Sequence, residues 1–337
     1  MRLTNKKIQE TVGLLDSIIE KYKEDKIEKK RDWRTYEQRF AYRSQTIFKE
    51  LKPLIYEATS NIKIIKFEQK GSKPLLTLEQ KVLALLLKHL IDKSNRDMSA
   101  MIVLFSWLSG ISISYKTIER LYSDEQVILV LHNLNQLMLK KKEIKKADCS
   151  GDGTGYSLSI KTHYASEAQK LKDKAKQNYS NKGYKKIKTV YSFALMDIKS
   201  KMYLGFGSSL KSEKEAYYNA FNMVKETGIS IRSIRLDRYY SFPSVVNFLS
   251  NSFGEINFFL IPKKNSTLKG SFKWKQMLSS FVENTPNFLN EYYKRNYSEG
   301  GFSEDKKRTG WKVGQKREDR IDTSIRLTGI WHNLYNL

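Results

Sequence analysis

Four polar side chains near the C-terminal end of the chain recur at helical spacing. In the stretch EYYKRNYSEGGFSEDKK, residues 291–307, Arg295, Glu299 and Lys306 follow Tyr292 after three, seven and fourteen residues. Because about 3.6 residues make a helical turn, these spacings keep all four side chains near one face of a helix. None of the four is an apolar residue of the kind that marks a buried stripe. What these four side chains do depends on which other residues the fold brings next to them.

Two further carboxylates stand where ligands commonly bind in α/β proteins. Asp152 lies in GDGTGY, within a predicted strand, and Asp237 ends another predicted strand, in IRLDRYY. Ligands and metals tend to bind at the carboxyl ends of strands in such sheets. If the helix with Glu299 lies against these strands, three acids meet without a histidine or cysteine. Such an oxygen-only site suits Mg²⁺ or Mn²⁺, and two ions about 3.5–4 Å apart would support phosphodiester cleavage.

Each acid also has an alternative interpretation. Asp148 competes with Asp152 as the first acid, because four residues along a strand return a side chain to the same face. The DGTG context favours Asp152. Asp237 is also consistent with an ordinary turn acid that follows a strand. Glu304 is the alternative third acid, but no Tyr and Arg precede it at the spacings found before Glu299.

The pattern of the chain changes near residue 147. Residues 1–146 read as helical throughout, with a capping-box start at Thr77 and Gln80. Five β-rich segments of strand length then follow, at 145–160, 186–198, 201–210, 229–237 and 254–264. The last two come after helical stretches, and a long final helix follows. The sequence therefore predicts an all-α region over 1–146 and an α/β domain over 147–337.

Within the helical region, residues 98–122 have the shape of a helix-turn-helix. An apolar helix ends at Gly110, and a second helix starts near Ser114 or Tyr115. The second helix would present Tyr115, Lys116, Glu119 and Arg120 outward. Reading of DNA by this element and plain helical packing both remain open, because any two helices joined at a glycine share this pattern.

The charge of the chain indicates a polyanionic partner. The 337 residues contain 61 Lys and Arg against 36 Asp and Glu, a formal net charge of +25. Nucleic acid fits best, because phosphates attract Lys and Arg regardless of base sequence. An anionic membrane surface is less suitable, since the charge is spread along the whole chain instead of one amphipathic segment.

The most basic stretch, 161–188, has nine lysines. It is either a solvated loop or a clamp on the DNA backbone, with Lys185 and Lys186 as candidate contacts. Tyrosines interleaved there would stack on unpaired bases. Three further candidate DNA ligands stand beside the predicted strand ends: Arg238, Lys263 and Lys264.

Cysteine content and hydropathy limit the location of the protein. The single cysteine, Cys149, excludes an intramolecular disulfide and a zinc site built from several cysteines. No apolar run suggests a signal peptide or a membrane span. The sequence predicts a cytoplasmic, nucleoid-associated protein that does not bind membranes.

The order Asp, Asp, Glu on a strand, a strand and a helix resembles the DDE transposases of insertion sequences. Tyr292, Arg295, Glu299 and Lys306 match, at all spacings, the Tyr-x2-Arg-x3-Glu-x6-Lys signature of one large bacterial and archaeal group of them. The stretches DGTGY, IRLDRYYS, FFLIPKKNSTLKG and GIWHNLYNL also resemble motifs of that group. The resemblance covers about residues 148–337.

This resemblance implies an RNase H-like domain with a mixed five-stranded sheet flanked by helices. It further implies that Asp152, Asp237 and Glu299 hold two Mg²⁺, with Mn²⁺ as a substitute. Tyr292, Arg295 and Lys306 would then hold the phosphates and terminal bases of the transposon end. The implied reaction is cleavage at terminal inverted repeats and transfer of the freed 3′-hydroxyl to target DNA, by a homodimer on DNA.

Two other functions remain open at this point. One keeps the fold and describes an RNase H-like nuclease or resolvase that cuts without joining. The other is a non-catalytic DNA-binding protein, either a regulator that uses residues 98–122 or a decayed transposase. One local feature also stands out in the final helix: Gly300 and Gly301 each cost about 1 kcal/mol relative to alanine, so a kink or a helix end is expected there.

Overall fold

The computed structural model describes the chain except residues 1–2, 25–31, 61, 63–75, 110–112 and 159–188, and except the side chains of 103–109. The part before residue 146 is helical. Its helices are α1 (Asn5–Gly13), α2 (Leu15–Glu24), α3 (Trp33–Ser60), α4 (Leu78–Ile91), α5 (Asn95–Ser109), α6 (Tyr115–Leu121) and α7 (Glu125–Lys141). The predicted capping box at the start of α4 is present, since Thr77 and Gln80 each accept from the other's backbone N–H.

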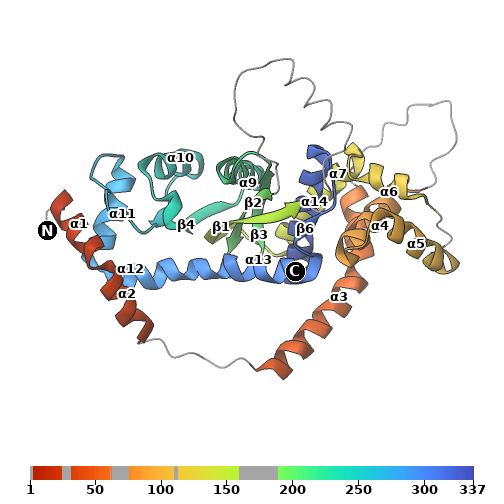
Figure 1. Ribbon diagram of the computed structural model, residues 1–337, viewed down its shortest axis with the longest axis horizontal. Helices are drawn as coiled ribbons and strands as arrows, with labels where there is room; N and C mark the ends of the chain where they lie inside the picture. Colours follow the sequence, from red (N-terminus) through yellow and green to blue (C-terminus); the bar gives the residue numbers. More distant parts are fainter. Residues whose placement is uncertain (1–2, 25–31, 61, 63–75, 110–112, 159–188) are drawn as a thin grey trace, which may run out of the picture.

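A mixed sheet forms the centre of the second half (Figure 1). Its strands are β1 (Lys146–Leu158), β2 (Thr189–Asp197), β3 (Tyr203–Ser209), β4 (Ser230–Arg235), β5 (Asn257–Phe259) and β6 (Lys312–Val313). The order is β3-β2-β1-β4-β5, with β2 antiparallel to both of its neighbours and β1, β4 and β5 parallel. The short β6 pairs with the end of β1 and is an addition to the five predicted strands. The mixed α/β architecture is confirmed and is consistent with an RNase H-like domain.

Helices cover both faces of this sheet (Figure 1). The helices after β3 are α9 (Glu213–Thr227), α10 (Pro243–Phe253), α11 (Phe272–Glu283), α12 (Thr285–Tyr292), α13 (Asn296–Thr309) and α14 (Glu318–Asn336). Helix α9 packs on β2 and β3, and it comes so close that a Cβ at Gly205 would lie 2.4 Å from the Ala220 carbonyl oxygen. Helix α13 packs on the other face, along β1. A short 3₁₀ turn, η2 (Tyr293–Arg295), joins α12 to α13.

The hydrophobic core runs across the predicted boundary at residues 146 and 147. Helices α3, α4 and α7 pack against the C-terminal helix α14, whose Trp331 indole donates to the carbonyl of Leu86 in α4. Helices α1 and α2 lie at the opposite end of the molecule from α3–α7 (Figure 1), where α1 contacts α11. There Asn5 accepts from the backbone N–H of Leu268. The two-domain division therefore stays a prediction from the change in secondary structure.

Helices α5 and α6 occupy the segment predicted as a helix-turn-helix. Ser114 caps α6 by accepting from the Thr117 N–H. Lys116 and Arg120 are exposed, as expected, but Glu119 is half-buried and forms an ion pair with Arg320 of α14. Tyr115 is also half-buried, under the guanidinium of Arg96, so two of the four side chains expected to point outward are partly covered. Within the part of the chain that the structure describes, every helix falls short of the length and apolar character needed to cross a bilayer.

The helix end expected at Gly300 and Gly301 does not occur, because α13 continues through both residues. Gly301 faces the sheet, and a Cβ there would lie 2.5 Å from Met196 Cε and 2.8 Å from Tyr203 Oη. Gly300 faces open space. Gly300 therefore lies on the solvent side of α13, and Gly301 allows α13 to approach the sheet closely.

These two glycines give a matched pair of variants. We expect Gly301→Ala to lower the free energy of unfolding by about 1–3 kcal/mol, because the new methyl group overpacks a filled site. Gly300→Ala should raise it by about 0.5–1 kcal/mol, because alanine favours the helix and meets no neighbour. Urea unfolding monitored by circular dichroism measures both changes. Equal effects of the two substitutions would contradict the packing described here.

Candidate active site

Parallel pairing of β1 with β4 places two of the predicted acids side by side. Ser150 of β1 is paired with Arg235 of β4, and Asp152 and Asp237 each come two residues later. Asp237 also begins the 3₁₀ turn η1 (Arg238–Tyr240), where its Oδ1 accepts from the Tyr239 N–H at 2.7 Å. This bond fixes the carboxyl group at the end of the strand.

Glu299 of α13 completes the group, and all three carboxylates converge on the guanidinium of Arg295. Arg295 Nη2 lies 2.6 Å from Glu299 Oε1 and 3.6 Å from Asp237 Oδ2. Arg295 Nη1 lies 3.9 Å from Asp152 Oδ1. The side chains of Asp152 and Arg295 are only 18% and 17% exposed, whereas those of Asp237 and Glu299 are 39% and 46% exposed. The site is thus open to solvent on the side of Asp237 and Glu299.

Burial and neighbouring charge perturb Asp152. Its burial raises the pKa of the carboxyl group to about 6, and the charges of Glu299 and Asp237 act in the same direction. The guanidinium of Arg295 opposes this change in pKa and does not cancel it. A carboxyl group with a raised pKa beside two other acids is typical of a functional site.

Buried hydroxyl groups fasten α13 to β1 next to the acids. Ser150 Oγ and Ser298 Oγ lie 2.8 Å apart, and each is 2.8 Å from the carbonyl oxygen of Arg295. Because Ser150 precedes Asp152 by two residues and Ser298 precedes Glu299 directly, these bonds set the distance between strand acid and helix acid. Sequence reasoning did not identify either serine, since serine in a helix beside a glutamate is common.

A second fastening lies on the other side of the site. The buried guanidinium of Arg235, two residues before Asp237, forms an ion pair with Glu291 at the end of α12. Its Nε also donates to the Glu291 carbonyl oxygen at 3.0 Å. Strand β4 is therefore tied to the residue that directly precedes Tyr292.

Further along α13, a buried carboxylate links three elements. Asp305, whose side chain is 1% exposed, accepts from the hydroxyl of Tyr203 in β3 at 2.8 Å and contacts His332 Nδ1 of α14 at 2.8 Å. Arg308 Nη1 lies 3.4 Å from the same carboxylate. His332 Nε2 lies 2.8 Å from the carbonyl oxygen of Lys201. We call Asp305, Tyr203, His332 and Arg308 the Asp305 cluster; no spacing in the sequence predicted it.

The four signature residues do not share the one continuous helix that their spacing predicted: Tyr292 ends α12, Arg295 lies in η2, and Glu299 and Lys306 lie on α13. Tyr292 is buried, and Arg295 lies over its ring with 5.7 Å between the guanidinium carbon and the ring centroid. The ring therefore backs the guanidinium instead of facing solvent, and this burial raises the pKa of Tyr292 to about 12. Lys306 Nζ donates to the hydroxyl of Thr154 at 2.7 Å, and burial lowers the pKa of this lysine.

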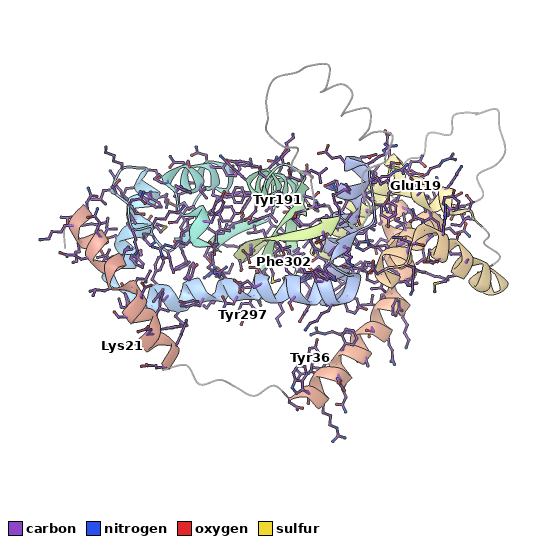
Figure 2. All side chains as sticks on the ribbon, viewed as in Figure 1. Lys21, Tyr36, Glu119, Tyr191, Tyr297 and Phe302 are labelled. Atoms are coloured by element: carbon purple, nitrogen blue, oxygen red, sulfur yellow. The ribbon has the colours of Figure 1, made fainter. Side chains whose placement is uncertain are left out.

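Figure 2 shows two residues that mark the sides of α13. Phe302 points towards the sheet and is buried, whereas Tyr297 lies on the solvent side and is 47% exposed. Lys306 follows Phe302 by one turn and remains half-buried. The four signature residues lie along the edge formed by α12, η2 and α13, between the sheet and solvent.

Three of the predicted DNA ligands gather beside Asp237. Arg238, Lys263 and Lys264, with Tyr239, line an open hollow of about 400 Å³. Lys263 Nζ donates to the Tyr239 carbonyl oxygen at 3.1 Å and lies over the ring of Phe242. Lys185 and Lys186 lie outside the described residues.

The alternative acids occupy other surroundings. Asp148 forms an ion pair with Arg232 and accepts from Ser233, and the hydrogen bond from Arg232 lowers the pKa of Asp148 to about 2. In the part of the chain that the structure describes, the hydrogen bonds and ion pairs of the Asp148 carboxyl group are with Arg232 and Ser233, and none is with Arg295, Asp237 or Glu299. Glu304 pairs with Arg308, one turn further along α13. Neither alternative acid joins the group around Arg295.

The donor set of the site consists of carboxylate oxygens, which hard divalent cations prefer. Among the described residues, however, no three Asp, Glu, His or Cys side chains already surround a common metal position. The guanidinium of Arg295 lies within 4 Å of all three carboxylates. The residue types fit Mg²⁺ or Mn²⁺, provided that Arg295 moves away from the carboxylates.

A relative of the chain is a probable transposase. The chain is 38% identical over 336 residues to the probable transposase for insertion sequence element ISA1214 from Archaeoglobus fulgidus. The match covers 99% of this chain and 97% of the relative. No family model matches the chain.

Proposed function

The chain belongs to the insertion-sequence transposases, and from this premise we propose that it is a DDE transposase that cuts DNA at terminal inverted repeats and joins the ends to target DNA. The convergence of Asp152, Asp237 and Glu299 on one cation carries this proposal. The three acids come from three separate elements of an RNase H-like fold. The chain that carries them has a net charge of +25, which suits a DNA substrate.

In this proposal Asp152, Asp237 and Glu299 hold two Mg²⁺, with Mn²⁺ as a substitute. When bound, such ions activate the attacking hydroxyl group and stabilise the leaving oxygen in phosphodiester cleavage. The protein supplies the geometry: Ser150 and Ser298 keep the strand acid and the helix acid at a fixed distance. The bond from Tyr239 N–H keeps Asp237 at the mouth of the site.

The cations around the acids orient the DNA. Arg295, backed by Tyr292, presents a planar guanidinium that suits two oxygens of one phosphate. Lys306 provides a point charge further along α13, beside Thr154. The hollow lined by Arg238, Lys263 and Lys264 extends this positive surface past Asp237. Two transposon ends must react together, so we propose a homodimer on DNA.

An end-processing assay tests the proposal. The purified protein is incubated with a labelled duplex that carries the element's terminal inverted repeat, a supercoiled target plasmid, and Mg²⁺ or Mn²⁺ at increasing concentration. We expect cleavage at the repeat boundary and joined products, both dependent on the metal. Glu299→Gln should lose both products, because the third carboxylate is removed.

Glu304→Gln is the matched control, since Glu304 lies on the same helix and its side chain is 46% exposed, as is that of Glu299. It should process ends as the wild type does. Cleavage without joined products would instead favour a nuclease or resolvase. Binding of the repeat without any cleavage would favour a non-catalytic DNA-binding protein.

A further inference from the structure

Arg295 neutralises the same oxygen atoms that the proposed metal ions need. Its two terminal nitrogens lie 2.6, 3.6 and 3.9 Å from Glu299 Oε1, Asp237 Oδ2 and Asp152 Oδ1. With an exposed fraction of 17%, the side chain is largely shielded from water. Three carboxylates gathered around one side chain repel one another, and a guanidinium with five N–H donors relieves that repulsion.

A guanidinium in this position and a divalent ion exclude each other. Both are cations, both are attracted to the same carboxylate oxygens, and the terminal nitrogens of Arg295 already lie 2.6 to 3.9 Å from an oxygen of each acid. The backbone of Arg295 is fixed, because its carbonyl oxygen contacts the hydroxyl groups of Ser150 and Ser298 at 2.8 Å. Departure from the acids must therefore occur by rotation of the side chain.

We propose that Arg295 is an internal counter-cation of the resting site, and that a phosphate of the DNA end draws it off the carboxylates before a divalent ion binds them. The inference rests on the proposed function, because it concerns the same site. A phosphate is a natural bidentate partner of arginine. Binding of end DNA and binding of metal then favour each other, and this coupling is reciprocal.

Mn²⁺ binding to the full-length protein, measured by electron paramagnetic resonance without DNA, tests the inference. We expect Arg295→Gln to bind Mn²⁺ about tenfold more tightly than the wild type, within the usual range of coupling between sites. Lys294→Gln is the matched control: it removes the same charge from the neighbouring residue, which pairs with Glu291. It should bind Mn²⁺ as the wild type does.

A second titration adds a duplex with the element's end, and the Mn²⁺ bound by that duplex alone is subtracted. Wild-type affinity for Mn²⁺ should rise about tenfold, whereas that of Arg295→Gln should not change, because its counter-cation is already absent. Thermal unfolding provides a second measurement in case the variant is unstable. Without metal, Arg295→Gln should have a lower melting temperature than the wild type, and Mn²⁺ should restore that temperature.

Two results would overturn the inference for different reasons. If Arg295→Gln binds Mn²⁺ no more tightly than Lys294→Gln, while Asp152→Asn abolishes binding in each, the metal site stands and the counter-cation role fails. If no protein has a Mn²⁺ site that Asp152→Asn removes, with or without end DNA, the proposed metal site itself fails and the inference falls with it.

Discussion

The Asp152→Asn variant is expected to lose end cleavage by more than about a thousandfold and yet to unfold at a higher temperature than the wild type at pH 7.5 without metal. Loss of one preorganised hydrogen-bond donor at a reaction centre costs about 10²–10³ in rate, and a carboxylate that holds a divalent ion should cost at least as much. The unfolding temperature should rise, because the substitution removes a buried negative charge.

The pKa of Asp152 fixes the pH range of this stabilisation. Burial raises that pKa from 3.8 to about 6, so the folded state binds the proton more tightly than the unfolded state. The stability that protonation provides is complete below about pH 4 and is lost as the pH rises through about 6. Asparagine resembles the protonated acid, so the variant should gain on the order of 2 kcal/mol at pH 7.5 and almost nothing at pH 4.

Asp148→Asn is the matched comparison, because Asp148 lies on the same strand and the same chemical change is made. Its pKa is lowered to about 2 by Arg232, so its ionised form stabilises the fold above pH 4, and the variant should unfold earlier at pH 7.5. End cleavage should be retained. Thermal unfolding at pH 4 and 7.5, together with the cleavage assay, checks both variants. Cleavage lost in Asp148→Asn and kept in Asp152→Asn would reverse the assignment of the first acid.

The Asp305→Ala variant is expected to lose about 3–5 kcal/mol of unfolding free energy, because it leaves the largely buried guanidinium of Arg308 and the other buried partners of Asp305 without their carboxylate. The ring of His332 lies between Asp305 Oδ1 and the carbonyl oxygen of Lys201, each 2.8 Å from a ring nitrogen, and the variant removes the first of these contacts. Arg308 and the hydroxyl of Tyr203 lose the same partner. Urea unfolding measures the loss.

Two comparisons separate the Asp305 cluster from its surroundings. Glu304→Ala changes the neighbouring, exposed acid of α13 and should alter the unfolding free energy by less than about 0.5 kcal/mol. Asp305→Asn keeps the shape and the bond from Tyr203, so it should lose less than Asp305→Ala. If Asp305→Ala unfolds at the same urea concentration as Glu304→Ala, the Asp305 cluster does not hold α13 in place.

The sequence predicted the secondary structure well where local patterns determine it. Alternation and β-branched residues marked β1 to β5, but the two-residue β6 is too short to show any period. The cost of glycine in a helix predicted a kink or a helix end at Gly300 and Gly301, but α13 continues through both, and Gly301 lets the helix pack closely against Met196 and Tyr203. Docking of α1 on α11 has no local signal at all.

The sequence likewise predicted one part of the candidate site and missed another. Spacing and strand ends marked Asp152, Asp237 and Glu299, and the structure brings their carboxylates to one guanidinium. Their assignment as metal ligands stays a prediction. Spacing assigned Arg295 to DNA, whereas its contact with all three acids depends on three-dimensional distances that no pattern along the chain records. The buried position of Tyr292 depends in the same way on how α12 meets the sheet.

The contact between Asn5 and Leu268 joins residues that are 263 positions apart, and it affects the order of events during synthesis. The first helices leave the ribosome long before their binding surface on α11 exists, and α14, which fills the core beside α4 and α7, emerges last. Contacts so distant along the chain form slowly. A nascent chain that stalls before α14 can already dock its first helix on α11, but the surfaces of α3, α4 and α7 that pack against α14 stay exposed until that helix is made.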